Sequence, residues 1–296
     1  MAYNLKLAML ENNRELEIVL DNLLKPEEGP EHKVIDAMRY STLGGGKRIR
    51  PFLVMSCAEL FDVKKKSALR VAAAFEMVHC YSLIHDDLPA MDDDNMRRGR
   101  PTCHVQFDEA TAILAGDALL TKAFEILACE KTHQDAHVRI DLVRSLAKAC
   151  GHAGMVGGQM LDIEAEDHEL KMPEITRLQR MKTGELISAS CEAGAILGKA
   201  PDHSRQLLYA YAHDIGLAFQ ITDDLLDVEG DEEAVGKKTG KDMEAGKATF
   251  VSLLGVQRAR KQAELLGQQA QKHLEPFGDV ALPLCHLAHF IVNRSS

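Results

Sequence analysis

Aromatic residues and long apolar runs are scarce in this sequence. Phe and Tyr make up 5% of the 296 residues and there is no tryptophan, whereas Ala, Leu, Met, Glu and Lys recur throughout. Because strands favour aromatic and β-branched side chains, this composition favours helices over sheets. No apolar run approaches the roughly 18 residues of a membrane span. The first residues are charged where a secretory signal needs an apolar core, so we expect neither a membrane span nor a signal peptide.

The sequence also lacks any paired cysteine motif. Its seven cysteines are odd in number, widely spaced and never arranged as CxxC. That pattern disfavours a disulfide framework or a zinc site and is typical of reduced thiols in a cytoplasmic protein. Free cysteines are among the most buried residue types, so we expect these to be small core side chains. They are Cys57, Cys80, Cys103, Cys129, Cys150, Cys191 and Cys285.

Basic residues are outnumbered, with 35 Lys and Arg against 45 Asp and Glu, which gives a formal net charge of −10. Nucleic-acid binding normally needs a basic surface, so the charge balance argues against it. Hydrophobic residues at 46% and charged residues at 27% are typical of an ordinary globular protein. An anionic ligand held at a local basic site remains compatible with this composition.

Helical periodicity runs through nearly the whole chain. Apolar residues recur at a spacing of three and four in the stretches 66–88, 108–130, 173–197, 204–227 and 249–274. Pro51, Pro173 and Pro201 stand where helices can start, and Pro89 where one should end. No repeat, linker or change in composition indicates a domain boundary. The sequence therefore predicts a single all-α domain over residues 1–296, with about ten or more helices.

Two acidic clusters, residues 86–94 and 223–233, hold 12 of the 45 acidic residues. The second begins on a helix, where Gln220, Asp223, Asp224 and Asp227 are spaced to share one face. The first ends a helix that also carries His79, seven residues before Asp86 and on the same face. Pro89 then turns the chain, which predicts that Asp92 returns toward Asp86 through a distorted last turn.

Carboxylates in such clusters repel one another. A pair at 4 Å costs about 4 kcal/mol at an effective dielectric constant of 20. A solvated acidic helix end is the ordinary explanation for one cluster, but two clusters that both open with Asp-Asp favour a divalent cation. Oxygen ligands alone suit Mg²⁺, which keeps waters and completes its shell with phosphate. An EF-hand is disfavoured, because the loop from Asp92 has no glycine at its sixth position.

Basic residues are concentrated near the acidic clusters and in one glycine-rich segment. Gly44–Pro51 combines three glycines with three cations, so the backbone can approach phosphate that Arg grips bidentately. It is not a Walker loop, because Ser41 stands where the first glycine belongs and Arg48 where Ser or Thr should follow Lys47. The other basic groups are Arg97, Arg98 and Arg100, then Lys182, and finally Lys237, Lys238, Lys241 and Lys247.

Together these segments resemble the trans-prenyltransferases, or isoprenyl diphosphate synthases, and most of all the bacterial farnesyl diphosphate synthases among them. The likeness runs from about residue 30 to the C-terminus. It rests on GGGKRIRP (44–51), DDLPAMD (86–92), RRGRPT (97–102), GGQMLD (157–162), KTG (182–184) and FQITDDLLD (219–227). The resemblance implies a helical bundle around a central cavity and the condensation of isopentenyl diphosphate with an allylic diphosphate.

The resemblance also implies roles for individual residues. Three Mg²⁺ ions per site, for which Mn²⁺ can substitute, would be held by Asp86, Asp92, Asp223 and Asp227, with Asp87 and Asp224 as further catalytic carboxylates. The allylic diphosphate would contact Arg97, Lys182, Lys237 and Lys247. The diphosphate of isopentenyl diphosphate would bind Gly46, Lys47, Arg50, His79 and Arg98. Thr183 and Gln220 would lie beside the allylic carbon that ionises. A cytoplasmic homodimer is the family expectation.

Product length is expected from the helix before Asp86. Family members with an aromatic residue at the position of Tyr81, beside Ser82, and two extra residues in the first motif stop at C15, which predicts farnesyl diphosphate. Geranyl or geranylgeranyl diphosphate is the alternative on the same scaffold. A terpene cyclase or a noncatalytic metal-binding subunit is disfavoured, because both aspartate motifs and the isopentenyl-site cations are present.

Some positions depart from the family pattern or have a simpler explanation. Asn95 replaces an acidic residue that often ends the first motif, and Arg294 is the single cation of the last five residues. The sequence therefore does not predict a C-terminal cap over the site. Gly151, Gly154, Gly157 and Gly158 are expected to permit close helix packing, in preference to contacting a ligand.

Overall fold

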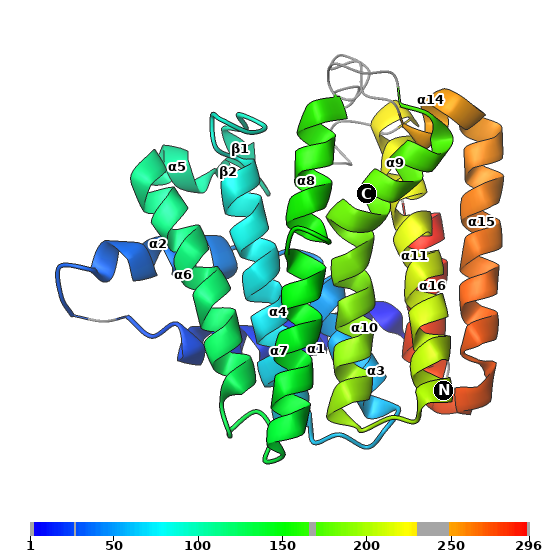
Figure 1. Ribbon diagram of the computed structural model, residues 1–296, viewed down its shortest axis with the longest axis horizontal. Helices are drawn as coiled ribbons and strands as arrows, with labels where there is room; N and C mark the ends of the chain where they lie inside the picture. Colours follow the sequence, from blue (N-terminus) through cyan, green and yellow to red (C-terminus); the bar gives the residue numbers. More distant parts are fainter. Residues whose placement is uncertain (1–2, 27, 166–169, 230–248, 295–296) are drawn as a thin grey trace.

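The computed structural model describes residues 3–26, 28–165, 170–229 and 249–294. These residues form a bundle of helices with one two-stranded hairpin (Figure 1). The first elements are α1 (Leu5–Leu23), α2 (His32–Thr42), α3 (Ile49–Glu59), α4 (Lys65–Asp86), β1 (Met96–Arg97), β2 (Arg100–Pro101), α5 (Cys103–Gln106), α6 (Glu109–Ala128), α7 (Ala136–Cys150) and α8 (Met155–Glu164). They are followed by α9 (Met172–Gln179), the π-helical turn η2 (Arg180–Gly184), α10 (Glu185–Leu197), α11 (Asp202–Glu229), α14 (Phe250–Leu254), α15 (Val256–His273), the 3-10 helix η3 (Glu275–Ala281) and α16 (Leu282–Asn293).

The predicted all-α fold is confirmed, with two local corrections. The stretch 249–274 is not one helix, because Gly255 at φ 76° ends α14 and begins α15. The stretch 173–197 is interrupted by η2, whose wider turn separates α9 from α10. Hydrophobic periodicity does not detect either feature, since a single positive-φ residue or an inserted π turn leaves the apolar spacing on each side intact.

The apolar interior consists of two clusters that share helices. One cluster gathers buried residues of α4, α6 and α7, and the other gathers those of α11, α15 and α16. Helices α3 and α10 contribute to both, because each is buried on nearly every face. Gly194 of α10 allows this contact, since a Cβ there would lie 2.6 Å from the backbone nitrogen of Ala58 on α3.

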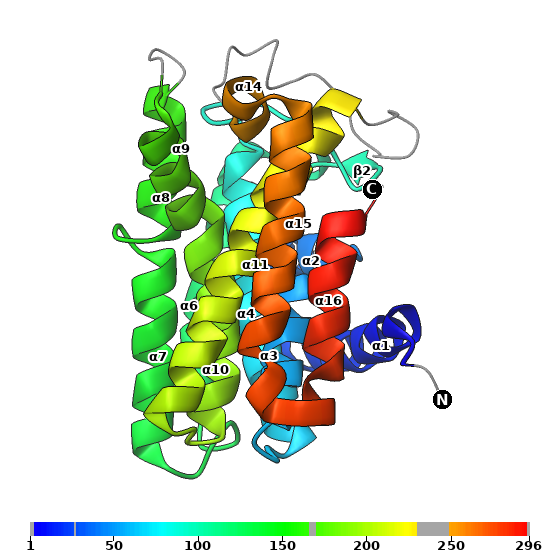
Figure 2. The ribbon, with the colours of Figure 1, turned by 90° about the vertical axis from the view of Figure 1, so that its right-hand side faces the viewer.

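The two aspartate motifs lie at the same end of the bundle. Helices α4 and α11 both end where the hairpin and α14 lie, at the top of Figure 1. In the view turned by 90°, α15, α11 and α16 run along the length of the bundle, whereas α1 lies across this length beside α16 (Figure 2). Residues 86–92 and 223–227 are far apart in the sequence but are thus directed toward one end of the molecule.

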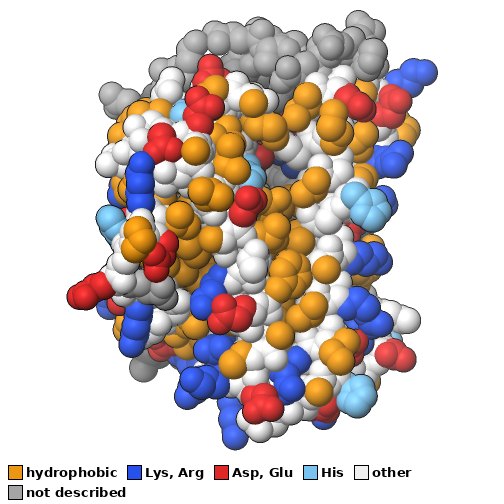
Figure 3. Space-filling model, turned by 60° about the vertical axis from the view of Figure 1, so that its left-hand side comes forward, with side chains coloured by type: hydrophobic (Ala, Val, Ile, Leu, Met, Phe, Trp, Pro, Cys, Tyr) orange, Lys and Arg blue, Asp and Glu red, His pale blue; other side chains and the backbone are white. Residues whose placement is uncertain are grey.

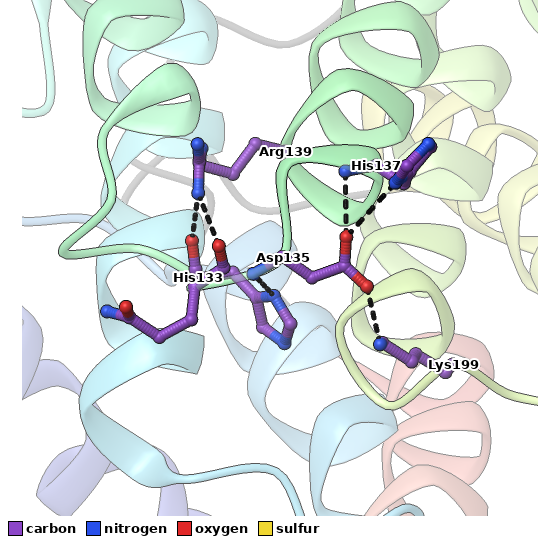
Figure 4. A network of polar contacts seen from close by, with 6 residues as sticks. His133, Asp135, His137, Arg139 and Lys199 are labelled. Carbon is purple, nitrogen blue, oxygen red and sulfur yellow. Dashed lines mark hydrogen bonds and ion pairs between the residues drawn. The ribbon is translucent and has the colours of Figure 1, made fainter.

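The opposite end is joined by polar contacts around Asp135. This residue caps α7 by accepting a hydrogen bond from the backbone nitrogen of His137 at 2.9 Å, and it pairs with Lys199 at 2.5 Å (Figure 4). The hydrogen bond from Lys199 is the main cause that lowers the pKa of Asp135. The pair links the turn before α7 to the turn after α10.

The cysteine and membrane predictions have clear outcomes. All seven thiols are free, and five of the cysteines are buried as expected, whereas Cys129 and Cys285 are partly exposed. Among the residues the structure describes, no helix is both long and apolar enough to cross a membrane.

Candidate active site

The first aspartate motif begins at the end of α4. Beyond the helix, the backbone nitrogen of Asp92 donates a hydrogen bond to the carbonyl oxygen of Asp86 at 2.8 Å. The chain therefore doubles back, and the return of Asp92 toward Asp86 predicted from Pro89 is observed. Asp92 is close enough for its charge to act on the carboxyl of Asp86.

Asp86 lies in a poor environment for a lone carboxylate. Burial, the largest cause, raises its pKa to about 6, and the charges of Asp92 and Asp87 act in the same direction. Lys182 and Arg97 oppose this shift without cancelling it. A divalent cation would compensate the remaining repulsion, and a donor set of carboxylate oxygens alone suits Mg²⁺.

Asp87 has a different partner from Asp86. Its side chain is 3% exposed, and its two oxygens accept hydrogen bonds from Nε and Nη2 of Arg97 at 2.6–2.8 Å. Arg97 belongs to β1, in a hairpin whose turn is formed by Arg98 and Gly99 at positive φ. The ion pair thus fixes the hairpin against the end of α4 and holds Arg97 beside the first motif. Sequence reasoning missed this positioning contact.

Lys182 and Thr183 lie in η2, the π-helical turn. The turn packs on α8, where a Cβ on Gly158 would lie 2.2 Å from the backbone nitrogen of Lys182. The expectation that this glycine permits close helix packing is therefore confirmed. Nζ of Lys182 donates to Oδ2 of Asp162 on α8 at 2.6 Å, with both side chains mostly buried. Asp162, the last residue of the GGQMLD segment, holds Lys182 in place, a partner that sequence reasoning did not identify.

Another residue of the same segment has unsatisfied polar atoms. Both carboxamide atoms of Gln159 are buried and have no hydrogen-bond partner within the part of the chain that the structure describes. Buried polar groups of native proteins are nearly always satisfied, so Gln159, on the helix that packs against η2, has capacity to bind a water or a ligand.

The second aspartate motif is divided between solvent and core. On α11, the carboxylate of Asp223 is 47% exposed, whereas Asp224 is buried and accepts a hydrogen bond from the backbone nitrogen of Phe250 at 2.7 Å. Asp227 is partly exposed and Gln220 is buried. The contact of Asp224 gives it a structural partner at the start of α14, which the shared helical spacing does not reveal.

The C-terminal helix reaches this motif. Nη2 of Arg294 donates to Oδ1 of Asp223 at 2.5 Å and to the carbonyl oxygen of Phe219 at 3.1 Å, while its guanidinium stacks on the Phe219 ring at 3.9 Å. The Arg294 side chain is 2% exposed. The sequence did not predict a cap from this single cation, yet the end of the described chain lies on the second motif.

Basic residues form a second group beside α4. The pKa of His79 is lowered well below its usual value, first by burial and then by Arg50, Arg98 and Arg97. The negative charge of Asp223 in turn acts on Arg50 and raises its pKa, against the larger effect of burial. Two of the cations expected to bind isopentenyl diphosphate, Arg50 and Arg98, therefore act on His79, and Arg50 also interacts with the second aspartate motif.

The glycine loop lies against this basic group. A Cβ on Gly46 would fall 2.7 Å from the Arg98 guanidinium, whose Nη1 donates to the carbonyl oxygen of Gly45. Gly46 has φ 127°, a backbone conformation that glycine adopts at no steric cost, so its backbone favours glycine at this position. Lys47 is exposed next to it.

Of the residues expected to set product length, Tyr81 lies on the side of α4 away from His79, whereas Ser82 lies one turn before Asp86. Tyr81 packs edge-on against the ring of His85 with centroids 5.0 Å apart, and Oγ of Ser82 donates to the carbonyl oxygen of His79 at 2.9 Å. His85 contacts the carbonyl oxygen of Ile113 at 3.0 Å. A Cβ on Gly116 would lie 2.2 Å from its ring, so α6 needs a glycine there. Sequence reasoning missed both His85 and Gly116.

Lys237 and Lys247, which are expected to contact the allylic diphosphate, lie outside the described residues. Among the residues that the structure describes, no group of three or more His, Cys, Asp or Glu side chains is arranged so that it could hold a metal ion. The cavity expected at the centre of the bundle stays a prediction.

Comparisons with known proteins agree with this geometry. Residues 31–280 match the family model described as polyprenyl synthetase. The chain is 47% identical over 269 residues to the farnesyl diphosphate synthase of Escherichia coli (strain K12), which covers 88% of this chain and 89% of that one. It is 43% identical to the geranylgeranyl diphosphate synthase of Cyanophora paradoxa, over 95% of this chain and 94% of that one. A solved structure described as an FPP/GFPP synthase from Zymomonas mobilis superposes with a TM-score of 0.90 at 48% identity, covering 99% of this chain and 100% of the other.

Proposed function

This chain belongs to the polyprenyl synthetase family, and on that premise we propose that it is a Mg²⁺-dependent prenyltransferase that makes farnesyl diphosphate from isopentenyl diphosphate and dimethylallyl or geranyl diphosphate. One observation carries the proposal. Carboxylates and cations interact at one end of the bundle. The charges of Lys182 and Arg97 act on Asp86, and the charge of Asp223 acts on Arg50. Such a site binds two diphosphates through cations and metal ions together.

The allylic diphosphate is assigned to the side of the site formed by α4, the hairpin and η2. Asp86, Asp92, Asp223 and Asp227 would hold Mg²⁺, which when bound supplies electrophilic stabilisation of the departing diphosphate. Lys182 donates hydrogen bonds to the leaving oxygens, held in place by Asp162 at 2.6 Å. Arg97 adds a second fixed charge through its contact with Asp87. Lys237 and Lys247 are proposed as further contacts.

Isopentenyl diphosphate is assigned to the basic group beside α4. Lys47, Arg50 and Arg98 supply the positive charge, and Gly46 lets the backbone come close to the diphosphate. Because burial, and after it the surrounding cations, lowers the pKa of His79, its ring is neutral near pH 7 and binds by donating a hydrogen bond without adding charge.

The reacting carbons are assigned to the space between these groups. Loss of diphosphate leaves an allylic carbocation, the double bond of isopentenyl diphosphate attacks it, and a proton leaves the new prenyl chain. Oxygen dipoles stabilise such a cation, and Thr183 in η2 and the Gln220 carboxamide on α11 are the groups proposed for this role. No nucleophilic side chain is required, and the departing diphosphate is the proposed base.

Geranylgeranyl diphosphate is the second candidate product. A geranylgeranyl diphosphate synthase matches this chain at 43% identity over nearly its full length, close to the 47% of the Escherichia coli enzyme. Identity therefore does not separate the two products, and the proposal of C15 rests on the bulk of Tyr81 beside α6.

We also propose a cytoplasmic homodimer. Helices α6 and α7 expose the apolar side chains of Ile113, Leu114 and Ile140, each more than 40% accessible. Figure 3 shows apolar side chains gathered across the middle of the side of the molecule that these helices help to form. Light scattering after gel filtration tests this: Leu114→Glu is expected to convert a dimer to a monomer, and a wild-type monomer would refute the proposal.

The proposed activity is tested by incubating the protein with isopentenyl diphosphate, each allylic primer and Mg²⁺, and identifying products by mass. We expect a C15 diphosphate from dimethylallyl and geranyl primers. Asp86→Ala and Asp223→Ala are each expected to reduce the rate by more than a thousandfold, because both remove charge that holds metal ions. Absence of condensation, or condensation that survives both substitutions, would refute the proposal.

A further inference from the structure

The loop between α2 and α3 has an unusual backbone. Gly45 and Gly46 have φ of 79° and 127°, and Arg48 has φ 51°. Glycine adopts these values readily, but a residue with a Cβ pays about 1–2 kcal/mol in the left-handed region. A strained conformation of this kind persists only where the surroundings hold it in place. The side chain of Arg48 provides the reason.

The Arg48 guanidinium joins three helices inside the protein. Its side chain is 1% exposed, and its Nη2 donates to the carbonyl oxygen of Thr42, at the end of α2, at 2.6 Å. Its Nη1 donates to Oε1 of Glu76, in the second half of α4. Since Arg48 itself immediately precedes α3, one side chain ties the two ends of the glycine loop to the helix that carries the first aspartate motif.

Glu76 is the buried counterpart of this arginine and of a second one. Its side chain is also 1% exposed, and it lies three residues before His79, on the same face of α4. Its charge acts on Arg50 as well, where it opposes the lowering of the arginine pKa by burial. Glu76 is therefore a buried negative charge next to the group formed by Arg48, Arg50 and His79.

We propose that Arg48 and Glu76 are positioning residues for isopentenyl diphosphate, which fix the loop 44–50 on α4 so that Lys47 and Arg50 face the diphosphate. This inference rests on the function proposed above. Neither side chain is accessible to a ligand, so both act through the residues they hold. Buried ion pairs are often replaceable by apolar residues without loss of stability. We therefore expect this pair to matter for the conformation of the loop 44–50 and not for the free energy of unfolding.

The test separates the two substrates. In Arg48→Met and in the double variant Arg48→Met/Glu76→Leu, we expect the KM for isopentenyl diphosphate to rise at least tenfold, while the KM for geranyl diphosphate stays within twofold of wild type. Arg48→Met removes the direct partner of the buried Glu76 and leaves it only the charge of Arg50, so this variant is expected to lower Tm. The double variant leaves neither charge, so it is expected to keep a Tm near wild type and still bind isopentenyl diphosphate poorly. If Arg48→Met does not fold, the double variant decides.

Two further variants serve as controls. Arg39 makes the same kind of contact elsewhere: its Nη1 donates to the carbonyl oxygen of Leu24 at 2.5 Å and its Nη2 to Asp21 at 2.6 Å. Arg39→Met is expected to lower Tm without changing either KM. Arg48→Lys keeps the charge, but one ammonium cannot reproduce the planar fork that bridges Thr42 and Glu76. Its KM for isopentenyl diphosphate is expected between those of wild type and Arg48→Met.

The outcomes distinguish the inference from the function. If the wild-type protein condenses its substrates and the double variant retains its KM for isopentenyl diphosphate, the positioning role is overturned and the function stands. An equal rise of both KM values also overturns it, because that indicates general distortion. If the wild-type protein does not condense these substrates, the proposed function itself has failed.

Discussion

Two glycines lie near η2, and we expect an alanine to lower Tm at one of them and to raise it at the other. Gly158 faces the backbone of η2, and a Cβ there would lie 2.2 Å from the nitrogen and 2.5 Å from the Cα of Lys182. These are backbone atoms and cannot rotate away. Gly216, on α11, faces Gly184 at the end of the same turn, but its Cβ would lie 3.5 Å from the nearest heavy atom, an ordinary contact.

The magnitude follows from the distances. To relieve the contact at 2.2 Å, α8 and η2 must separate by about 1 Å, and overpacking of this kind costs about 1–3 kcal/mol. For a chain of this length that cost corresponds to a Tm lower by about 2–5 °C. Because the moving segment includes Lys182, a shift of about 1 Å is expected to reduce kcat by about tenfold to a hundredfold. Gly216→Ala instead removes a helix-interior glycine without a clash, a gain of about 0.5–1 kcal/mol.

Thermal unfolding and condensation kinetics of both variants check this reasoning. Gly158→Ala is expected to be less stable and slower, and Gly216→Ala to be at least as stable as wild type with nearly unchanged kcat. A Gly158→Ala protein with wild-type Tm and kcat would refute the claim that this contact positions Lys182. A Gly216→Ala protein that loses as much stability as Gly158→Ala would show that any side chain near η2 is harmful.

Three further predictions concern product length, metal requirement and acid stability. Tyr81→Ala is expected to shift the main product from C15 to C20 or longer, measured by mass, and an unchanged product length would contradict its assigned role. Arg294→Met is expected to lower the Mg²⁺ concentration for half-maximal activity by about two- to fivefold. The reason is that Mg²⁺ no longer competes with the ion pair at Asp223, which is worth about 0.5–1 kcal/mol. A higher Mg²⁺ requirement in this variant would contradict the competition. The hydrogen bond from Lys33 lowers the pKa of Asp108 to about 2, so its stabilising contribution is present above pH 4 and lost as the pH falls toward 2. Asp108→Asn is therefore expected to make Tm less dependent on pH between 4 and 2, and a slope equal to that of wild type would contradict the linkage.

Helices and motifs are predictable here because they depend on neighbours in sequence. The amphipathic spacing of residues 204–227 reports one face of a helix, and α11 indeed spans Asp202–Glu229. The turn at Pro89 is likewise local, which is why the return of Asp92 to Asp86 follows from the sequence. Gly255 and η2 escape prediction because they change the backbone of one or a few residues and leave the apolar pattern intact.

The partners of the charged residues depend on tertiary packing and are not predictable in this way. Asp162 and Lys182 are 20 residues apart, Arg48 and Glu76 are 28 apart, and Asp223 and Arg294 are 71 apart. Motif spacing identifies which residues carry charge for a ligand. It gives no information on which opposite charge holds each of them in place, because that depends on how α3, α4, α8 and α16 pack.

These pairings change the meaning of the net charge of −10. Within the described residues, two carboxylates of the acidic clusters are paired with arginines, Asp87 with Arg97 and Asp223 with Arg294. The cation Lys182 is likewise already paired, with Asp162. In the proposed function, a diphosphate with its metal ions would exchange partners with these ion pairs and would not have to desolvate isolated charges. Because a buried charge without a partner costs several kcal/mol, this exchange lowers the free-energy cost of assembling so many charges in one site. The same pairing keeps each side chain in position before the ligand arrives, which is the condition for electrostatic stabilisation of a leaving group.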